Sequence, residues 1–201
     1  MILPFDELNL LIEKYNLPFL GLIDEEVVED DVYDLLIAAF IYGVNDAKEM
    51  LDADVELNAL LGERIIHKKV AGKTFRDRIR RYFDEAFADG LEYYVMISGQ
   101  RTRLADAIVK IAETETTRVF SETIEETGRQ IAKETRRKVL KQWVTMGDER
   151  VRTTHALLDG VRVPLGDLFH TIDGDSAQGP GGFSTAEENC GCRCWLQLAY
   201  A

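Results

Sequence analysis

The sequence predicts a mainly α-helical protein with an N-terminal helical body, a long central helix and a small C-terminal α+β domain. Apolar residues recur at helical spacing through much of the first 143 residues, and the stretch 102–143 contains no proline and a single glycine, Gly128. The last third changes to short alternating segments separated by glycines, which is typical of strands and turns. The composition, 46% hydrophobic and 30% charged, is that of a globular protein. We therefore expect an acidic helical region (1–62), a helical body with the long helix (63–143) and a terminal domain (144–201).

The acidic region is expected to be helical throughout. Residues 5–16 place Leu8, Leu11 and Tyr15 on one helical face. Residues 25–43 follow Asp24, a favourable N-cap residue, and end near Gly43. Residues 46–61 continue as a weaker helix. These sixty residues contain no pattern of a catalytic site.

Charge is distributed unevenly along the chain, whose net charge is −12. Residues 1–60 contain fifteen acids and two bases, whereas residues 61–145 contain eighteen bases and thirteen acids. The acidic front would repel DNA, while the basic middle could attract it. Because the basic surplus is small and interleaved with acids, we favour attraction between these two parts, or to a charged neighbouring subunit, over nucleic-acid binding.

Gly62 and Gly72 bracket the change of charge and mark the candidate boundary of the helical body. A helix capped by Thr74 is then predicted within residues 74–99. Several arginines lie largely outside its apolar face and could contact DNA or acidic residues of another subunit, although a solvated surface is the commoner outcome. These arginines are Arg76, Arg78, Arg80 and Arg81.

Residues 102–143 are predicted to form one long helix, or two helices broken near Gly128, because a glycine inside a helix costs about 1 kcal/mol relative to alanine. Glu115 falls within the apolar stripe of this helix, where an unpaired carboxylate would be costly. Arg118 lies one turn further on. We expect these two residues to form an ion pair that determines how the terminal domain packs on the helix.

The terminal domain is predicted to begin with a short helix through His155 to Leu158, capped by Thr145 or Asp148. Asp159 and Gly160 then make a turn into a strand at 161–164, and a second strand is expected at 192–198. If these two strands pair, His155 could face Cys192 and Cys194. The long loop at 171–189 is expected to be mobile or docked on a partner.

The cysteines and histidines of this domain allow three interpretations. Buried packing is favoured, with the cysteines as small hydrophobic residues. A zinc site comes second, with His155, Cys192 and Cys194 as ligands and a fourth from Cys190, His170 or Asp159. A thiol nucleophile with a histidine base and Asp159 comes last, because no oxyanion-type glycine turn accompanies a cysteine. Separately, the arginines Arg150, Arg152 and Arg193 are expected to hydrogen-bond to Asp148, Asp159 or chain-end carbonyls and so hold a small domain together.

This region resembles the phage Mu F-like domain, a family that contains the minor head proteins of tailed phages, also called head morphogenesis proteins. The resemblance runs from near residue 105 to the end of the chain, and its motifs occur in the family's order. The matching residues of the terminal domain are Trp143, Asp148, Arg150, Arg152, His155, Asp159, Gly160, Pro164, Phe169, Cys192, Arg193 and Cys194. An upstream helix with Ala112, Glu115, Thr116 and Arg118 is similar to the family's usual lead-in. The family generally has an asparagine directly before Cys-Arg-Cys, whereas this chain has Gly191 there and its asparagine at Asn189.

The resemblance implies a structural minor head protein, not an enzyme. Such a protein is part of the virion, is assembled in the host cytoplasm, contacts the portal or the major capsid protein, and could take part in DNA entry into the host. No small-molecule substrate is implied, and no apolar run reaches the roughly 18 residues that a membrane span needs. One alternative is a metal- or thiol-dependent hydrolase or toxin-like effector built on the same terminal domain. Another is a DNA-binding accessory protein that contacts phage DNA through residues 76–81.

Overall fold

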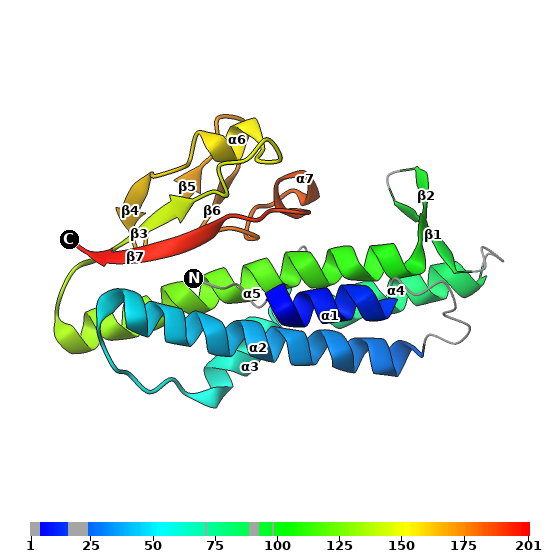
Figure 1. Cartoon of the computed structure of the whole chain (residues 1–201), viewed down its shortest axis with the longest axis horizontal. Coiled ribbons are helices and arrows are strands. Elements are labelled where there is room, and N and C mark those ends of the chain that lie inside the picture. Colours follow the sequence, from blue (N-terminus) through cyan, green and yellow to red (C-terminus); the bar gives the residue numbers. More distant parts are fainter. Residues whose placement is uncertain (1–4, 16–23, 71, 89–92, 98) are drawn as a thin grey trace.

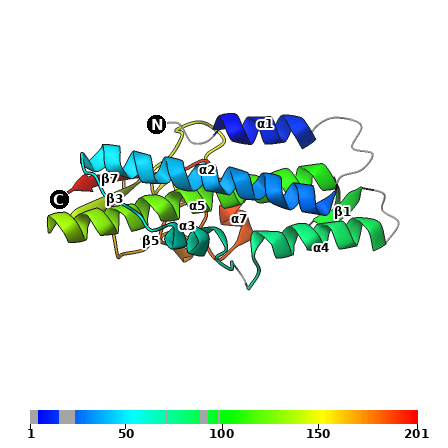
Figure 2. The same cartoon turned by 90° about the horizontal axis from the view of Figure 1, so that it is seen from below.

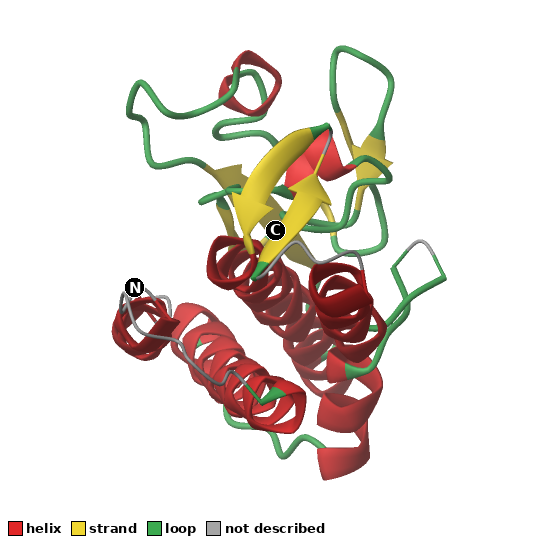
Figure 3. Ribbon diagram, turned by 90° about the vertical axis from the view of Figure 1, so that its right-hand side faces the viewer, coloured by secondary structure: helices red, strands yellow, loops and turns green. Residues whose placement is uncertain are grey.

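The computed structural model describes residues 5–15, 24–70, 72–88, 93–97 and 99–201. Helices form one layer, and a small unit of strands and short helices lies across one side of it (Figures 1 and 3). The elements, in chain order, are α1 (Phe5–Tyr15), α2 (Glu25–Leu51), α3 (Ala59–Ile66), α4 (Phe75–Ala88), β1 (Tyr94–Ile97), β2 (Gln100–Arg103), α5 (Leu104–Thr135), β3 (Val139–Val144), α6 (Thr153–Ala156), β4 (Arg162–Pro164), β5 (Phe169–His170), β6 (Ser176–Ala177), α7 (Ala186–Asn189) and β7 (Trp195–Tyr200). The predicted fold class, mainly helical with a long central helix and a small C-terminal α+β part, is confirmed.

The helical layer is organised around α5, which contacts α1, α2, α3 and α4 as well as the strands (Figure 2). The predicted stop of α2 at Gly43 is wrong, because this helix continues to Leu51. A Cβ atom at Gly43 would lie 2.9 Å from Cβ of Thr123 on α5. The glycine therefore allows two long helices to approach closely and does not end one of them. The predicted helix at 46–61 is interrupted: Asp52 adopts a left-handed conformation, and α3 begins only after the Asn58 cap.

The central helix is shorter than the predicted 102–143. It ends at Thr135, where Arg136 takes a left-handed conformation, and residues 139–144 form β3. Gly128 does not break the helix. Its missing side chain makes room for Leu198 of β7, whose Cδ1 would lie 2.6 Å from an added Cβ. Buried and partly buried residues alternate along β3, as in a strand. The sequence analysis missed this strand because the same residues also satisfy helical spacing.

The principal sheet has the antiparallel order β4-β3-β7. The pairing of 161–164 with 192–198, which the sequence analysis considered as a condition, does not occur, because β3 lies between these strands. Trp143 of β3 pairs with Leu196 of β7, and Leu140 pairs with Pro164 of β4. Apolar residues of the strands join those of the helices in a continuous hydrophobic core. The sheet is thus packed onto α5 and α2.

The helix predicted within residues 74–99 is also too long. It begins after Thr74, as expected: the Thr74 hydroxyl accepts from the amide of Asp77, and the Asp77 carboxylate accepts from the amide of Thr74. It ends at Ala88, and the hairpin β1-β2 follows. The β-branched and aromatic residues of 93–97 are the signal that the prediction missed.

The segment 171–189 is not an open loop. It contains β6, paired with β5, and the short helix α7. Phe183 and Ala177 are buried, and Gly181 sits directly against the backbone of Arg118 on α5. The expectation of a mobile loop is therefore not met, because this segment packs between the sheet and α5; docking on a partner stays a prediction.

The acidic front and the basic middle attract each other, as favoured from the sequence. Arg76 of α4 lies 2.7 Å from Glu29 of α2, and Arg80 lies 3.0 Å from Glu25.

Across the described stretches, no helix has the length and apolarity needed to cross a membrane.

Candidate metal centre

His155 lies on the short helix α6, inside the terminal unit. The helix begins after Arg152, which makes no side-chain cap; the predicted capping by Thr145 or Asp148 is not observed. The imidazole is 1% exposed. It stacks on the ring of Phe183 at 5.4 Å and meets the ring of Trp143 edge-on at 5.2 Å. These aromatic contacts hold the ring in one orientation.

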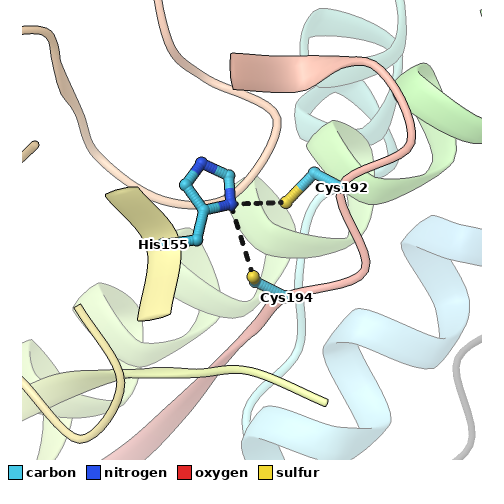
Figure 4. A group of neighbouring side chains, drawn as sticks. All are labelled: His155, Cys192 and Cys194. Carbon is cyan, nitrogen blue, oxygen red and sulfur yellow. Dashed lines mark hydrogen bonds between the residues drawn. The ribbon is translucent and has the colours of Figure 1, made fainter. Parts of the chain in front are cut away.

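Cys192 and Cys194 lie on the extended segment that leads into β7. Alternate residues of an extended chain point to the same side, so both sulfurs face the imidazole. The Nδ1 atom of His155 lies 3.5 Å from each sulfur (Figure 4). Both cysteines are buried, and both are free thiols. The conditional prediction that His155 faces these cysteines is confirmed, although β3 intervenes between the strands.

The two thiols differ in their affinity for protons. A hydrogen bond from Cys194, helped by the neighbouring His155, lowers the pKa of Cys192 to about 5, although burial opposes this. The same hydrogen bond, together with burial, raises the pKa of Cys194. Cys192 therefore loses its proton more readily than Cys194. A thiolate beside a neutral imidazole is the donor chemistry that zinc prefers.

Glu188 of α7 completes the surroundings of His155. Its Oε2 atom lies 3.0 Å from Nε2 of His155, off the direction of a hydrogen bond, and accepts a hydrogen bond of 3.0 Å from the Thr154 hydroxyl. A carboxylate on the far nitrogen of a ligating imidazole is the usual outer partner in metal sites. The sequence interpretation did not single out Glu188. The sequence does contain a signal, because Glu188 is an acid close to the cysteines. Glu187 is the adjacent residue, however, and only the fold shows which of the two acids lies beside His155.

The described residues contain one group of histidine, cysteine and carboxylate side chains close enough to share a metal ion: His155, Cys192 and Cys194. In a tetrahedral zinc site, bonds of about 2.3 Å to sulfur and about 2.0–2.1 Å to nitrogen place these ligands about 3.5 Å apart. The observed nitrogen–sulfur distances of 3.5 Å match this edge. The group therefore fits a metal ion in its donor atoms and its spacing.

The three candidates for a fourth ligand lie outside this group. Cys190 is exposed, and its backbone carbonyl accepts a hydrogen bond from Arg152. His170 is exposed on β5. Asp159 accepts hydrogen bonds from the amide and hydroxyl of Thr145, at 2.7 and 3.0 Å. Asp159 therefore does not orient His155, as the thiol-nucleophile interpretation requires; Glu188 occupies that position.

The other residues of the terminal motif hold the unit together. Arg193 lies 2.6 and 2.8 Å from the two carboxylate oxygens of Asp148, which lowers the pKa of that carboxyl. The amide of Arg150 donates to Asp148 at 3.1 Å. Gly160, at a φ of 76°, donates its amide to the carbonyl of Trp143. These contacts fix the segment that carries His155 against the segment that carries the cysteines.

The expected pair of Glu115 and Arg118 is present and buried at 1% exposure for each side chain, with contacts of 2.7 and 2.9 Å to one carboxylate oxygen. Arg118 also donates to the carbonyls of Ile65 and Ile66 at the end of α3. The other oxygen of Glu115 accepts from Arg78. The hydrogen bonds of the pair therefore join α3, α4 and α5, and do not hold the terminal domain on the helix as predicted.

The arginines considered for DNA contact are largely engaged within the molecule. Arg76, Arg78 and Arg80 pair with Glu29, Glu115 and Glu25, respectively. Arg81 stacks over the ring of Tyr82, with 4.7 Å to the ring centre.

The pattern of the family described as Phage Mu protein F like protein matches residues 71–197, which include α5, the metal-ligand group and the terminal sheet. This chain belongs to that family. The match begins earlier than the resemblance seen from the sequence and includes α4 with its arginines.

Two proteins with known names are similar in sequence to this chain. The Mu F-like chain is 32% identical over 144 residues to the protein named NAD(+)-arginine ADP-ribosyltransferase EFV of Enterococcus faecalis, covering 65% of this chain and 29% of that protein. It is 36% identical over 56 residues to Minor head protein GP7 of Bacillus phage SPP1, covering 28% of this chain and 18% of that protein. The chain thus spans less than a third of the length of either relative. No solved structure matches it.

Proposed function

We propose that this Mu F-like chain is a structural component of a phage head, built into the virion during assembly in the host cytoplasm. Family membership over residues 71–197 and the similarity to a minor head protein support this role. The observation that carries it is the construction of the candidate centre: His155, Cys192 and Cys194 are at most 6% exposed, and the imidazole contacts the rings of Trp143 and Phe183. A group enclosed in this way is suited to holding segments of the chain together.

Zinc is the proposed occupant of the centre, held by Nδ1 of His155 and the sulfurs of Cys192 and Cys194. When bound, it would supply bonds that join α6 to the segment before β7, in addition to the ion pair of Arg193 with Asp148. His155 is held for this by Phe183 and Glu188. The remaining coordination position would be filled by a ligand from outside this group, because Cys190, His170 and Asp159 lie elsewhere.

Metal content and thermal unfolding test this centre. The purified protein is expected to contain about one zinc ion per chain, and removal with a chelator is expected to lower its Tm. Cys194→Ala and His155→Ala should lose the metal and the effect of the chelator, whereas the matched controls Cys190→Ala and His170→Ala should keep both. Metal-free wild-type protein, or full metal content in Cys194→Ala, would exclude the zinc proposal.

The partner of the acidic region is proposed to be the portal or the major capsid protein. Deleting residues 1–60 is a poor test, because α2 is packed along α5 in the core. Reversing exposed charges is cleaner: Asp30→Lys with Asp34→Lys on α2 should reduce co-purification with the portal or capsid protein. The control is Asp167→Lys with Asp173→Lys on the terminal unit, where these carboxylates are equally exposed. Equal recovery of the partner with both double variants would contradict the proposed surface.

Contact with phage DNA through Arg76, Arg78, Arg80 and Arg81 has less support, since three of them pair with carboxylates of the same chain. A role in DNA entry into the host stays a prediction, to be tested by comparing DNA delivery by particles that contain and lack this protein.

A second candidate function is ADP-ribosyl transfer to arginine, as in a toxin-like effector. Its support is the 32% identity with the enterococcal protein of that name, over 144 residues. Incubation of the pure chain with labelled NAD and a soluble arginine acceptor tests it directly. Transfer of label would establish the activity, and its absence would leave the structural role.

A further inference from the structure

A second site lies on the opposite side of α5 from α2, at a cavity of about 350 Å³ between α4, α5 and the segment 181–190. Figure 2 shows α7, at the end of this segment, beside α4 and α5. Four basic side chains from three separate parts of the chain line the cavity. They are Lys73, before α4, Arg78 and Arg81 of α4, and Lys110 of α5. We call this space the basic cavity.

Three of the four basic side chains of the basic cavity form no ion pair with the described residues. Glu115 is the single acid among its lining residues, and its two oxygens already contact Arg78 and Arg118. Within the described part of the chain, Lys73, Arg81 and Lys110 have no carboxylate within 4 Å. On the side of α4 that faces α2, by contrast, Arg76 and Arg80 are both paired with acids of α2. Glu113 attracts Lys110 from beyond ion-pair distance, but three cations without an ion pair around one cavity are unusual in a chain with a net charge of −12.

The position of these cations explains why they lack partners. Acids of the front reach α4 only along the surface that faces α2, and the segment 181–190 brings no free acid to the cavity: both of its acids, Glu187 and Glu188, are absent from the lining. Like charges gathered around one cavity repel each other, and a bound anion would relieve that repulsion. The cavity is therefore set up to attract an anion from solution.

We propose that the basic cavity binds a phosphate group. A phosphate monoester carries close to two negative charges at neutral pH and three strong acceptor oxygens, which suits several converging donors. The Arg81 guanidinium can present two parallel donors, and the lysines supply point charges. Free phosphate has a similar charge, whereas each phosphodiester of a nucleic acid carries one negative charge and two free oxygens, so both are anions that these donors could bind. The site goes beyond the proposed head function and is independent of the metal.

Cys190 provides a built-in reporter for this site. Its thiol lines the basic cavity and is exposed, whereas Cys192 and Cys194 are buried. A ligand in the cavity should therefore slow the reaction of Cys190 with iodoacetamide, a neutral reagent whose approach does not depend on charge. The modified residue is identified by peptide mass spectrometry of the full-length protein.

The experiment compares three conditions at one ionic strength: chloride alone, inorganic phosphate, and a short single-stranded oligonucleotide. Protection of Cys190 by phosphate or by the oligonucleotide supports the site and identifies which source it accepts. In Arg81→Gln with Lys110→Gln, the concentration needed for half protection should rise about tenfold or more, because two charge-assisted contacts are lost. Both side chains are exposed, so the fold should be kept, as circular dichroism would verify.

The matched control is Lys133→Gln with Lys138→Gln, which removes the same charge from exposed positions near the far end of α5. Lys133 lies 23 residues beyond Lys110, or about 35 Å along the helix. This variant should be protected like the wild type. The proposal is overturned if neither ligand protects Cys190, or if the two double variants lose protection equally, because the effect would then come from overall charge.

Discussion

The imidazole of His155 is held between Glu188 and two cysteines: its Nε2 atom lies 3.0 Å from Oε2 of Glu188, and its Nδ1 atom lies 3.5 Å from both sulfurs. With a metal bound at Nδ1, the proton of the imidazole would lie on Nε2, beside the carboxylate of Glu188. Glu188 is therefore placed to stabilise the tautomer that ligates a metal.

Replacing Glu188 with glutamine tests this role. The affinity for zinc is expected to fall about 10–100-fold, as is usual when an outer partner of a ligating histidine is removed. Competition with a chromogenic chelator measures the affinity. Glu187→Gln is the control, because Glu187 is the neighbouring residue of α7 and is exposed. Equal affinities in the two variants would show that Glu188 does not position the imidazole.

Arg118→Met is expected to destabilise the protein by about 3–5 kcal/mol, because the buried carboxylate of Glu115 loses one of its two arginine partners. Glu115 would retain only Arg78, and the carbonyls of Ile65 and Ile66 would lose their donor. Denaturant unfolding measures the change. Arg103→Met removes a pair of the same spacing, with Asp106, on the exposed surface and should have little effect. Similar losses in the two variants would mean that burial does not strengthen this pair.

Gly181→Ala is expected to destabilise the protein more than Gly174→Ala. Both glycines have positive φ, so both variants carry a backbone cost of about 1–2 kcal/mol. At Gly181 the new Cβ would also lie 2.8 Å from the backbone nitrogen of Arg118, whereas Gly174 has open space. Overpacking of this kind adds about 1–3 kcal/mol. Thermal unfolding of the two variants gives the difference directly, and equal losses would contradict the close packing of the 171–189 segment on α5.

We expect Lys141 to make the free energy of unfolding of the protein increase with pH in the alkaline range. It is buried on β3, with its Nζ atom 3.0 Å from Glu125 and 2.7 Å from the carbonyl of Gln178. Burial lowers its pKa below the ordinary 10.5, although Glu125 opposes this shift. The folded protein therefore binds this proton less tightly than the unfolded chain, and the contribution of Lys141 to stability rises as pH increases through its folded pKa towards 10.5.

The corresponding variant is Lys141→Met, in which this pH dependence should be absent. At neutral pH the variant should be less stable by about 3 kcal/mol, because Glu125 loses one buried partner and keeps Arg129. The stability difference from the wild type should widen as pH rises, as followed by urea unfolding from pH 7 to pH 10. Lys133→Met, at an exposed site of α5, is the control. Parallel pH profiles of wild type and Lys141→Met would show that Lys141 is not shifted.

Several features of the fold were predictable because they depend on neighbours in sequence. Asp24 and Thr74 cap helices where expected, since an N-cap needs only a side-chain oxygen and amides two or three residues on. The pair of Glu115 and Arg118 could be inferred because residues three apart share a helix face. His155, Cys192 and Cys194 were named as possible metal ligands from their chemistry, second to buried packing, and the structure places them together.

Other features depended on what lies opposite in space. Gly43 and Gly128 look like helix ends in the sequence, yet each marks a close contact with another element, Thr123 of α5 or Leu198 of β7. Residues 139–144 satisfy both helical and strand spacing, and pairing with β4 and β7 makes them a strand.

Helical periodicity, capping and donor chemistry, which act over a few residues, were sufficient to establish a helical protein with a long helix and a histidine–cysteine group near its end. Tertiary packing placed Glu188 and not Glu187 beside His155, kept Cys190 away from the group of His155, Cys192 and Cys194, and gathered the bases of three segments around one cavity. The reason is physical: local propensities depend on the neighbouring residues, whereas the burial of a ligand, its outer partner and the balance of charge in a cavity depend on residues brought together only by the fold.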